Sequence, residues 1–163
     1  MGKKLSAHIS MKEAVFSKTA ERRIIDNTPN DDQLEVMKLT AEMIFEPVRE
    51  HFGVPIGITS FFRSKELNEA LRGSATSSHC KGEAIDIDAD VFGKITNKEI
   101  FMYIWENLEF DQLIWEFGDA DNPAWVHVSF RKGNNRKQIK KAVKVKQQGG
   151  YIAKYITYEN SKA

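Results

Sequence analysis

The sequence predicts an α+β fold in which helices pack around one side of a small antiparallel sheet. Residues 84–88 and 111–130 alternate apolar and polar side chains as half-buried strands do, and the turn-forming residues 118–124 divide the second segment into a hairpin. Residues 31–51 and 97–108 instead carry apolar side chains at spacings of three and four, which is typical of amphipathic helices. At 163 residues, the chain can form one domain with a substantial core.

Charge is distributed unevenly along an otherwise ordinary globular composition. The formal net charge is only +1, yet residues 83–121 carry eleven acidic side chains and two lysines, whereas residues 122–158 contain nine Lys or Arg and no Asp or Glu. We therefore predict a single domain over residues 1–163 with a basic C-terminal segment at about 131–163. Such a segment is usually a solvated face, although it could also hold an anionic polymer. No base-reading motif accompanies it, so specific nucleic-acid recognition is not predicted.

Neither a signal peptide nor a membrane span is recognisable in the sequence. Residues 1–6 include two lysines, but no apolar run of sufficient length follows them. No stretch approaches the about 18 apolar residues of a membrane span, so we expect cytoplasmic synthesis without membrane insertion. Cys80 is the only cysteine, which excludes an internal disulfide, and a buried, unreactive thiol is favoured there over a metal-binding thiolate.

Capping and turn residues set the predicted boundaries of the elements. The predicted helices are residues 10–20 (capping box Ser10 and Glu13), 31–51 (kinked or interrupted at Pro47 and ended by Gly53), 65–72 (cap Ser64, stop Gly73) and 97–108 (capping box Thr96 and Glu99). The predicted strands are residues 54–61, 84–88, 111–117 and 125–130, and Pro55 marks the first as an edge strand or a strand start. Residues 132–146 have no clear assignment, and residues 151–158 form either a last strand or an arm.

The second predicted strand and the residues before it gather groups that bind metals. Asp86 and Asp88 are two residues apart and therefore share a face of the strand. Gly82 permits a sharp turn before the strand, so that His79 can fold back toward Asp86. His127, on the last predicted hairpin strand, can supply a third ligand. Two imidazoles and one carboxylate suit zinc with an open fourth position, so we expect the sheet to bear a His/Asp/His zinc site.

These residues belong to a longer pattern, Ser77-x-His79-x2-Gly82-x-Ala84-x-Asp86 followed at a distance by Trp125-x-His127-x-Ser129. The pattern resembles that of the zinc peptidases that cut bacterial cell-wall peptides, which include D-alanyl-D-alanine carboxypeptidases and the L-alanyl-D-glutamate endopeptidases of phages. The resemblance spans about residues 8–138 and includes Thr59–Ser64 and Phe110–Ile114. It implies a fold like that of hedgehog domains and D,D-peptidases, with one zinc ion per chain held by His79, Asp86 and His127.

A zinc peptidase also needs a general base and a group that stabilises negative charge. The resemblance implies that Arg63 binds a substrate carboxylate or stabilises the oxyanion. The best-known relatives place a glutamate three residues before the last histidine, where this chain has Ala124. We predict that Glu116 acts instead, by lying opposite His127 across the hairpin and sharing its face. The alternative bases are Asp88, Asp119 and Asp121.

Four side chains are predicted to contact substrate: Ser77, Arg63, Trp125 and Ser129. The two serines flank zinc ligands, although serines in loops and strands usually bond to backbone. Trp125 lies two residues from His127, where it could wall a cleft or belong to the core. His8 and His51 have no companion ligands in the sequence and are interpreted as surface residues.

The sequence therefore predicts a zinc-dependent hydrolase of peptidoglycan stem peptides, either a D-Ala-D-Ala carboxypeptidase or an L-Ala-D-Glu endopeptidase. Ala124 leaves a second hypothesis open, in which an inactive, zinc-stabilised domain binds cell wall or a protein. A nonenzymatic nucleic-acid-binding protein is the third, and it predicts salt-dependent binding that survives loss of the histidines. We expect a monomer that acts on peptidoglycan or its fragments at the bacterial cell wall, after phage lysis or as part of a virion.

Overall fold

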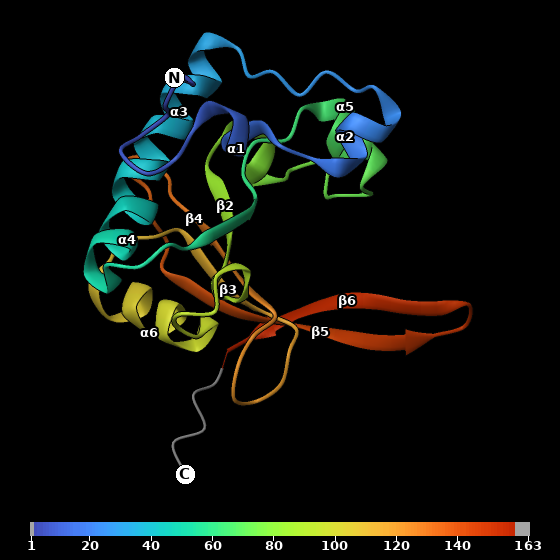
Figure 1. The fold of residues 1–163 in the computed structure, drawn as a ribbon. Coiled ribbons are helices and arrows are strands. Elements are labelled where there is room, and N and C mark those ends of the chain that lie inside the picture. Colours follow the sequence, from blue (N-terminus) through green and yellow to red (C-terminus); the bar gives the residue numbers. More distant parts are fainter. Residues whose placement is uncertain (1, 159–163) are drawn as a thin grey trace.

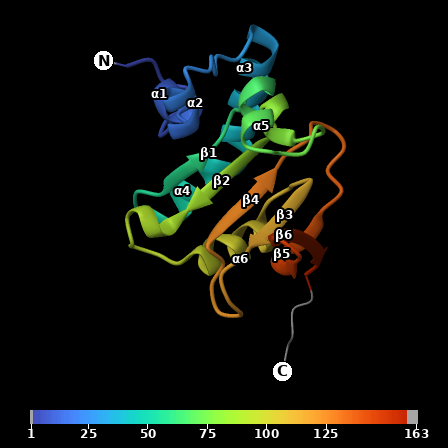
Figure 2. The ribbon, with the colours of Figure 1, turned by 90° about the vertical axis from the view of Figure 1, so that its right-hand side faces the viewer.

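A six-stranded sheet forms the centre of the computed structural model, in which residues 2–158 are described (Figure 1). The strands are β1 (Gly57–Ser60), β2 (Ala84–Asp88), β3 (Gln112–Glu116), β4 (Trp125–Ser129), β5 (Gln138–Gln147) and β6 (Gly150–Thr157). They lie in the order β1-β2-β4-β3-β5-β6, and Figure 2 shows β1, β2, β4 and β3 side by side in this order. All neighbouring pairs are antiparallel except β3 and β5, which are parallel. The predicted α+β fold is confirmed, with a sheet that is mostly rather than wholly antiparallel.

Helices and short helical turns make up most of the remaining structure. The α-helices are α1 (Met11–Val15), α2 (Lys18–Arg23), α3 (Asp31–Thr40), α4 (Glu46–Phe52), α5 (Lys65–Ala70) and α6 (Asn97–Asn107), and the shorter elements are the π-helical η1 (Ala41–Phe45) and the 3₁₀ turns η2 (Ser78–Lys81) and η3 (Ala89–Val91). Within the part of the chain that the structure describes, no helix has both the length and the apolar character needed to cross a membrane.

The two faces of the central strands have different environments. Helices α3, α4 and α6 lie on one side of the sheet (Figure 1). The side chains that β2, β3 and β4 turn toward this side are almost fully buried in the core: Ile85, Ile87, Leu113, Trp115, Val126 and Val128. Alternate residues on the same strands therefore point to the opposite face, away from these helices. That face holds the acidic and histidine side chains of β2, β3 and β4.

The predicted N-terminal helix is divided into two. The capping box at Ser10 is present, but the helix it opens ends at Val15 rather than near Ala20. Ser17 then caps a second helix by accepting a hydrogen bond from the Ala20 amide, 3.2 Å away. A serine hydroxyl competes with the helical backbone for amide groups and so favours caps over helix interiors. The prediction failed because it ignored this second cap.

The long predicted helix is continuous but irregular. Its α-helical hydrogen bonding gives way to a π-helical stretch, η1, just before Pro47, and α4 then continues to Phe52. Proline lacks the amide hydrogen, and its ring displaces the carbonyl four residues earlier, which widens the turn. Gly53 ends the helix in a left-handed conformation, with φ of 64°. The predicted interruption at Pro47 and stop at Gly53 are therefore both confirmed.

Smaller differences concern element ends and the basic segment. Strand β1 is shorter than predicted because Pro55 precedes its first ladder residue, and it is an edge strand as expected. Helix α5 ends at Ala70, and Arg72 rather than Gly73 adopts the left-handed conformation. Most of the basic segment forms the hairpin β5–β6, which continues the sheet and then projects beyond it (Figure 1). Residues 159–163 of that segment lie outside the described residues.

Candidate metal centre

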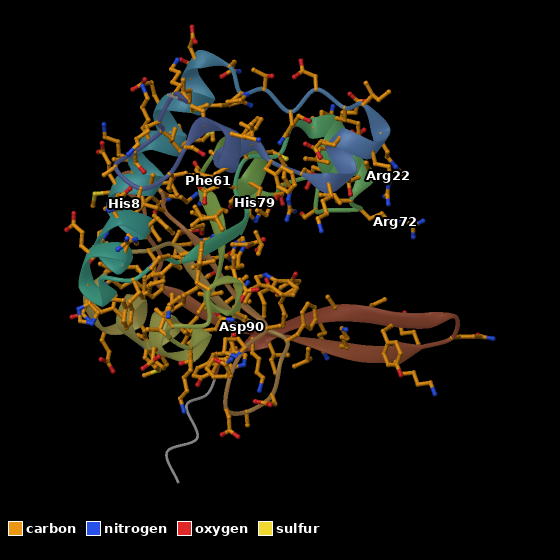
Figure 3. The ribbon with its side chains drawn as sticks, in the orientation of Figure 1. His8, Arg22, Phe61, Arg72, His79 and Asp90 are labelled. Atoms are coloured by element: carbon orange, nitrogen blue, oxygen red, sulfur yellow. The ribbon has the colours of Figure 1, made fainter. Side chains whose placement is uncertain are left out.

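Contacts with α3 on one side and with Phe61 on the other hold His79 in place. The 3₁₀ turn that carries it ends at Gly82, whose φ is 77°. A Cβ at Gly82 would come within 2.9 Å of the Gln33 carbonyl oxygen, so only glycine lets the turn lie against α3. On the other side, His79 Nδ1 lies 2.7 Å from the carbonyl oxygen of the buried Phe61 (Figure 3). Because a carbonyl oxygen only accepts, Nδ1 carries the hydrogen and Nε2 keeps a free lone pair.

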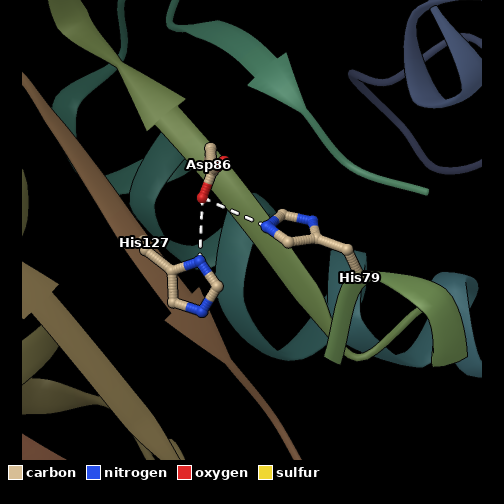
Figure 4. A group of neighbouring side chains, drawn as sticks. All are labelled: His79, Asp86 and His127. Carbon is tan, nitrogen blue, oxygen red and sulfur yellow. Dashed lines mark hydrogen bonds and ion pairs between the residues drawn. The ribbon is translucent and has the colours of Figure 1, made fainter. Parts of the chain in front are cut away.

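Asp86 and His127 meet because their strands are paired in register. They are direct partners in the β2–β4 ladder, so their side chains leave the same face of the sheet. Asp86 Oδ1 lies 2.9 Å from His127 Nδ1 and 3.4 Å from His79 Nε2 (Figure 4). Figure 4 shows the carboxylate reaching toward both imidazole rings. The η2 turn, the β2 strand that follows it and the sequence-distant β4 thus direct one ligand atom each at the same point.

The protonation states of these groups suit metal binding. Burial would raise the pKa of the Asp86 carboxyl, but the neighbouring His79 and His127 hold that pKa far below its usual range. Burial also lowers the pKa of His79, and this outweighs the opposite influence of Asp86. Asp86 is therefore ionised and His79 neutral near neutral pH. These are the forms in which carboxylates and imidazoles coordinate metals.

The donor set fits a single zinc ion. One atom from each of His79, Asp86 and His127 lies within 4.8 Å of the others. Zinc bonds of about 2.0–2.2 Å place the ligand atoms of a tetrahedral site about 3.3 Å apart, close to the distances found here. Three protein ligands leave the fourth position for substrate or water, which distinguishes catalytic zinc sites from structural ones. His79, Asp86 and His127 also line a cavity of about 370 Å³.

Glu116 reaches the same cavity by a different register from the one predicted. The residue opposite His127 is Ile114, and Glu116 is opposite Trp125 instead. The prediction of a direct Glu116–His127 pair is therefore wrong by two residues. A shift of two residues keeps the Glu116 side chain on the same face of the sheet as His127. Glu116 is then diagonal to His127, a distance that its long side chain can span. Burial raises the pKa of Glu116 to about 7, and the Asp86 charge contributes in the same direction.

Arg63 lies at the edge of the metal centre and lines the cavity. Its guanidinium Nη2 is 3.5 Å from Asp86 Oδ2, and its Nε donates to the Ser60 hydroxyl at 3.1 Å. Its backbone amide donates to the His79 carbonyl, which ties the Arg63 segment to the ligand turn. Arg63 is thus held beside the candidate metal ligands, and part of its guanidinium group faces the cavity.

Asn27 is a positioning residue that the sequence did not reveal. Its side-chain amide donates to the carbonyls of Val15 and Phe62, and its Oδ1 accepts from the Ser64 amide at 2.6 Å. These bonds hold the backbone on both sides of Arg63. In the sequence, Asn27-Thr28-Pro29 is only a combination of turn-forming residues. The role depends on contacts with residues about 35 positions away, which no local pattern specifies.

The other predicted substrate contacts lie in different environments. Ser77 and Trp125 line the cavity, and the Ser77 hydroxyl also accepts from the His79 amide. Ser129 is fully buried, and its hydroxyl accepts from the Gln112 amide. The Ser129 side chain is thus engaged with backbone and does not line the cavity, which places it away from a bound substrate.

The remaining candidates lie outside the group of three. The carboxylates of Asp88 and Asp119 accept backbone amides within their own turns, and Asp121 is exposed in the loop after β3. Cys80 is half-buried, and burial raises the pKa of its thiol, which disfavours the thiolate. His8 pairs with Glu46, and His51 stacks on Tyr103 at the surface.

Comparison with known proteins agrees with this geometry. A family model described as Peptidase M15 matches residues 7–129, which is more than half of the chain. No curated protein matches the chain significantly. Peptidases of this family are zinc enzymes, and the His79–Asp86–His127 group is able to bind one metal ion. The match ends at the last residue of β4, so the hairpin β5–β6 lies beyond it.

Proposed function

The chain belongs to the peptidase M15 family, and from this premise we propose that it hydrolyses peptide bonds within the stem peptides of peptidoglycan. The observation that carries the proposal is the convergence of two imidazoles, two carboxylates and a guanidinium on one cavity: His79, His127, Asp86, Glu116 and Arg63. A structural metal site would not need the second carboxylate or the cavity. The combination is that of a metal-assisted hydrolase.

Each residue has a distinct role in this reaction. Zinc, when bound by His79, Asp86 and His127, supplies Lewis-acid chemistry that polarises a carbonyl and favours ionisation of water near neutral pH. Glu116 accepts a proton from the attacking water and delivers it to the amide nitrogen as the C–N bond breaks. A pKa of about 7 lets this carboxyl exchange a proton in both directions at neutral pH. The Arg63 guanidinium stabilises the negative charge that develops on the carbonyl oxygen.

The space around the site supports cleavage inside a peptide rather than at its end. A second cavity of about 740 Å³ lies beyond the first, and both are lined by Arg63, Asp86 and Trp125. The metal centre thus has room for chain on two sides. A carboxypeptidase needs space for only one residue beyond the cut. We therefore propose an endopeptidase, with the L-Ala-D-Glu bond as its substrate.

Mass spectrometry of muropeptides tests the reaction and the base together. Purified peptidoglycan digested with the zinc-loaded protein should yield fragments cut after L-Ala, whereas release of free D-Ala would identify a carboxypeptidase. Glu116→Gln should lower the rate by about 10²- to 10⁴-fold while zinc content stays unchanged. Asp121→Asn removes an exposed carboxylate from the neighbouring loop and should behave as wild type.

The same experiment addresses the inactive binding module that Ala124 left open. Such a module would retain zinc and bind peptidoglycan but release no new amino termini. Position 124 cannot supply a base, but Glu116 on the adjacent strand lines the cavity in its place. Undiminished activity in Glu116→Gln would reject Glu116 as the base.

A further inference from the structure

The hairpin β5–β6 forms one wall of the cavity at the metal centre. Lys140 of β5 and Tyr155 of β6 line the cavity together with the three metal ligands. Strand pairing explains why: Lys140 is the ladder partner of Ile114, which is in turn the partner of His127. The three side chains form one row across the sheet and share a face. Residues outside the matched part of the chain therefore complete the site.

Alternation along β5 separates two neighbouring lysines. Lys140 points to the cavity face, whereas Lys141, one residue further, points to the opposite face. Consistent with this, Lys141 is close enough to the exposed Asp119 to help lower the pKa of that carboxyl, after the backbone amides of Asp121 and Asn122. The two lysines are adjacent in sequence and equal in charge, but only Lys140 lines the cavity.

Among residues 2–158, Lys140 has no carboxylate partner, whereas Arg63, the other cation of the site, has one. Lys140 and Arg63 are the Lys and Arg side chains that line the cavity. Arg63 lies 3.5 Å from Asp86, whereas no carboxylate among residues 2–158 lies within ion-pair distance of Lys140. The carboxylates in the cavity have other roles in the proposed reaction, with Asp86 on the metal and Glu116 as the base. The ammonium of this half-buried lysine lies beside the reaction centre and attracts a ligand carboxylate.

We infer that Lys140 binds a free carboxylate of the substrate and so makes the enzyme select acidic peptides. This inference rests on the proposed function and narrows its substrate class. The carboxylate binds on the same side of the sheet as the scissile bond, because the Lys140 and His127 backbones are two strand spacings apart, about 10 Å, and both side chains line the cavity. Tyr155 closes the same wall and presents a phenol to the bound peptide.

Binding of matched peptides tests the inference without requiring turnover. The probes are L-Ala-γ-D-Glu-L-Lys with free carboxylates and the same peptide amidated at each carboxylate in turn. Dissociation constants are measured by calorimetry on the zinc-loaded protein in the Glu116→Gln background. Amidation of one of the carboxylates should weaken binding by about 10-fold or more, since hydrogen bonds to charged groups are among the stronger hydrogen bonds. Lys140→Met should weaken binding of the free acid equally and remove the difference between the peptides.

Lys141→Met is the matched control, because it removes the same charge from the other face of the strand. It should retain the full preference for the free acid. Lys140→Gln serves as a second variant, and zinc content and circular dichroism establish that each variant is folded. Equal binding of the peptides by the Glu116→Gln protein with Lys140 intact, persistence of the preference in both Lys140 variants, or absence of peptide binding would each overturn the inference. Selective binding without any hydrolysis by wild type would instead reject the proposed function and leave the role of Lys140 standing.

Discussion

The centre and the far end of the sheet present their side chains to very different surroundings. In β2 and β4, the residues on either side of Asp86 and His127 are 0% exposed: Ile85, Ile87, Val126 and Val128. In β6, the exposed fraction of the large apolar and aromatic residues ranges from 40% for Ile156 to 68% for Tyr151. The outer part of the hairpin extends away from the rest of the molecule (Figure 3). Both regions nevertheless contribute side chains to the same cavity.

This difference separates two requirements of the site. Metal ligands must be held within a fraction of an ångström, so Asp86 and His127 lie on strands whose alternate residues are fixed by the core. A wall residue such as Tyr155 only has to shape the cavity, and a hairpin with few core contacts is sufficient. We expect substitutions in the centre to affect stability and metal binding strongly, and substitutions in the hairpin to affect mainly substrate selection.

Loss of a metal ligand should have the largest effect. His127→Ala removes one of the three donors and leaves the Asp86 charge with less compensation in a buried position. We expect loss of bound zinc and of detectable peptidase activity, measured by metal analysis and muropeptide release. His51→Ala, which alters a histidine that stacks on the surface, should leave both unchanged. Retention of stoichiometric zinc by His127→Ala would contradict the assigned ligand set.

Truncation in the core beneath the ligands should have the next largest effect. Ile87 is fully buried, and its strand neighbour Asp86 is one of the three candidate metal ligands. Ile87→Ala should destabilise the protein by about 2–5 kcal/mol, through lost burial and the cavity that remains. Urea unfolding of the zinc-free protein measures this change. A cost below about 1 kcal/mol would show that the centre is less tightly constrained than its burial indicates.

The raised pKa of Glu116 should be visible in how the free energy of unfolding changes with pH. Its folded pKa of about 7 lies above the usual 4.5, so its stabilising contribution is complete below about pH 4.5 and is lost as pH rises through 7. The depressed pKa of His79 acts in the opposite direction, so the comparison must be made with Glu116→Gln. Between pH 5 and 8, the free energy of unfolding of the zinc-free wild type should fall by on the order of 2 kcal/mol more than that of Glu116→Gln. The same pH dependence of stability in wild type and Glu116→Gln would contradict the raised pKa of Glu116.

A truncation in the hairpin should have the smallest effect. Ile152 is 47% exposed and lies on the hairpin face opposite Tyr155 and Tyr151. Ile152→Ala should change the free energy of unfolding by about 0.5 kcal/mol or less, as is usual for surface substitutions. The same urea experiment compares it directly with Ile87→Ala. A large decrease in the free energy of unfolding would mean that the hairpin unfolds cooperatively with the core.

Local patterns in the sequence predicted elements better than they predicted contacts. Ser10 and Thr96 each signalled a capping box that the structure contains, and Gly82 signalled the turn behind His79. The cap at Ser17 was overlooked although its signal is also local. The two-residue error in the partner of Glu116 is of another kind. It depends on the length and shape of the loop at residues 118–124, which composition does not specify.

The sequence by itself determined which residue types were available for the site and which of them share a strand face, because alternation along a strand is a local property. It therefore identified Asp86, His127 and Glu116 before any strand was paired. Only the tertiary structure decided that Phe61 orients His79, that Asn27 holds the Arg63 segment and that Lys140 lies beside the metal centre. Strand order and long-range hydrogen bonds arise from packing of the whole chain, and distant residues leave no local pattern from which such contacts follow.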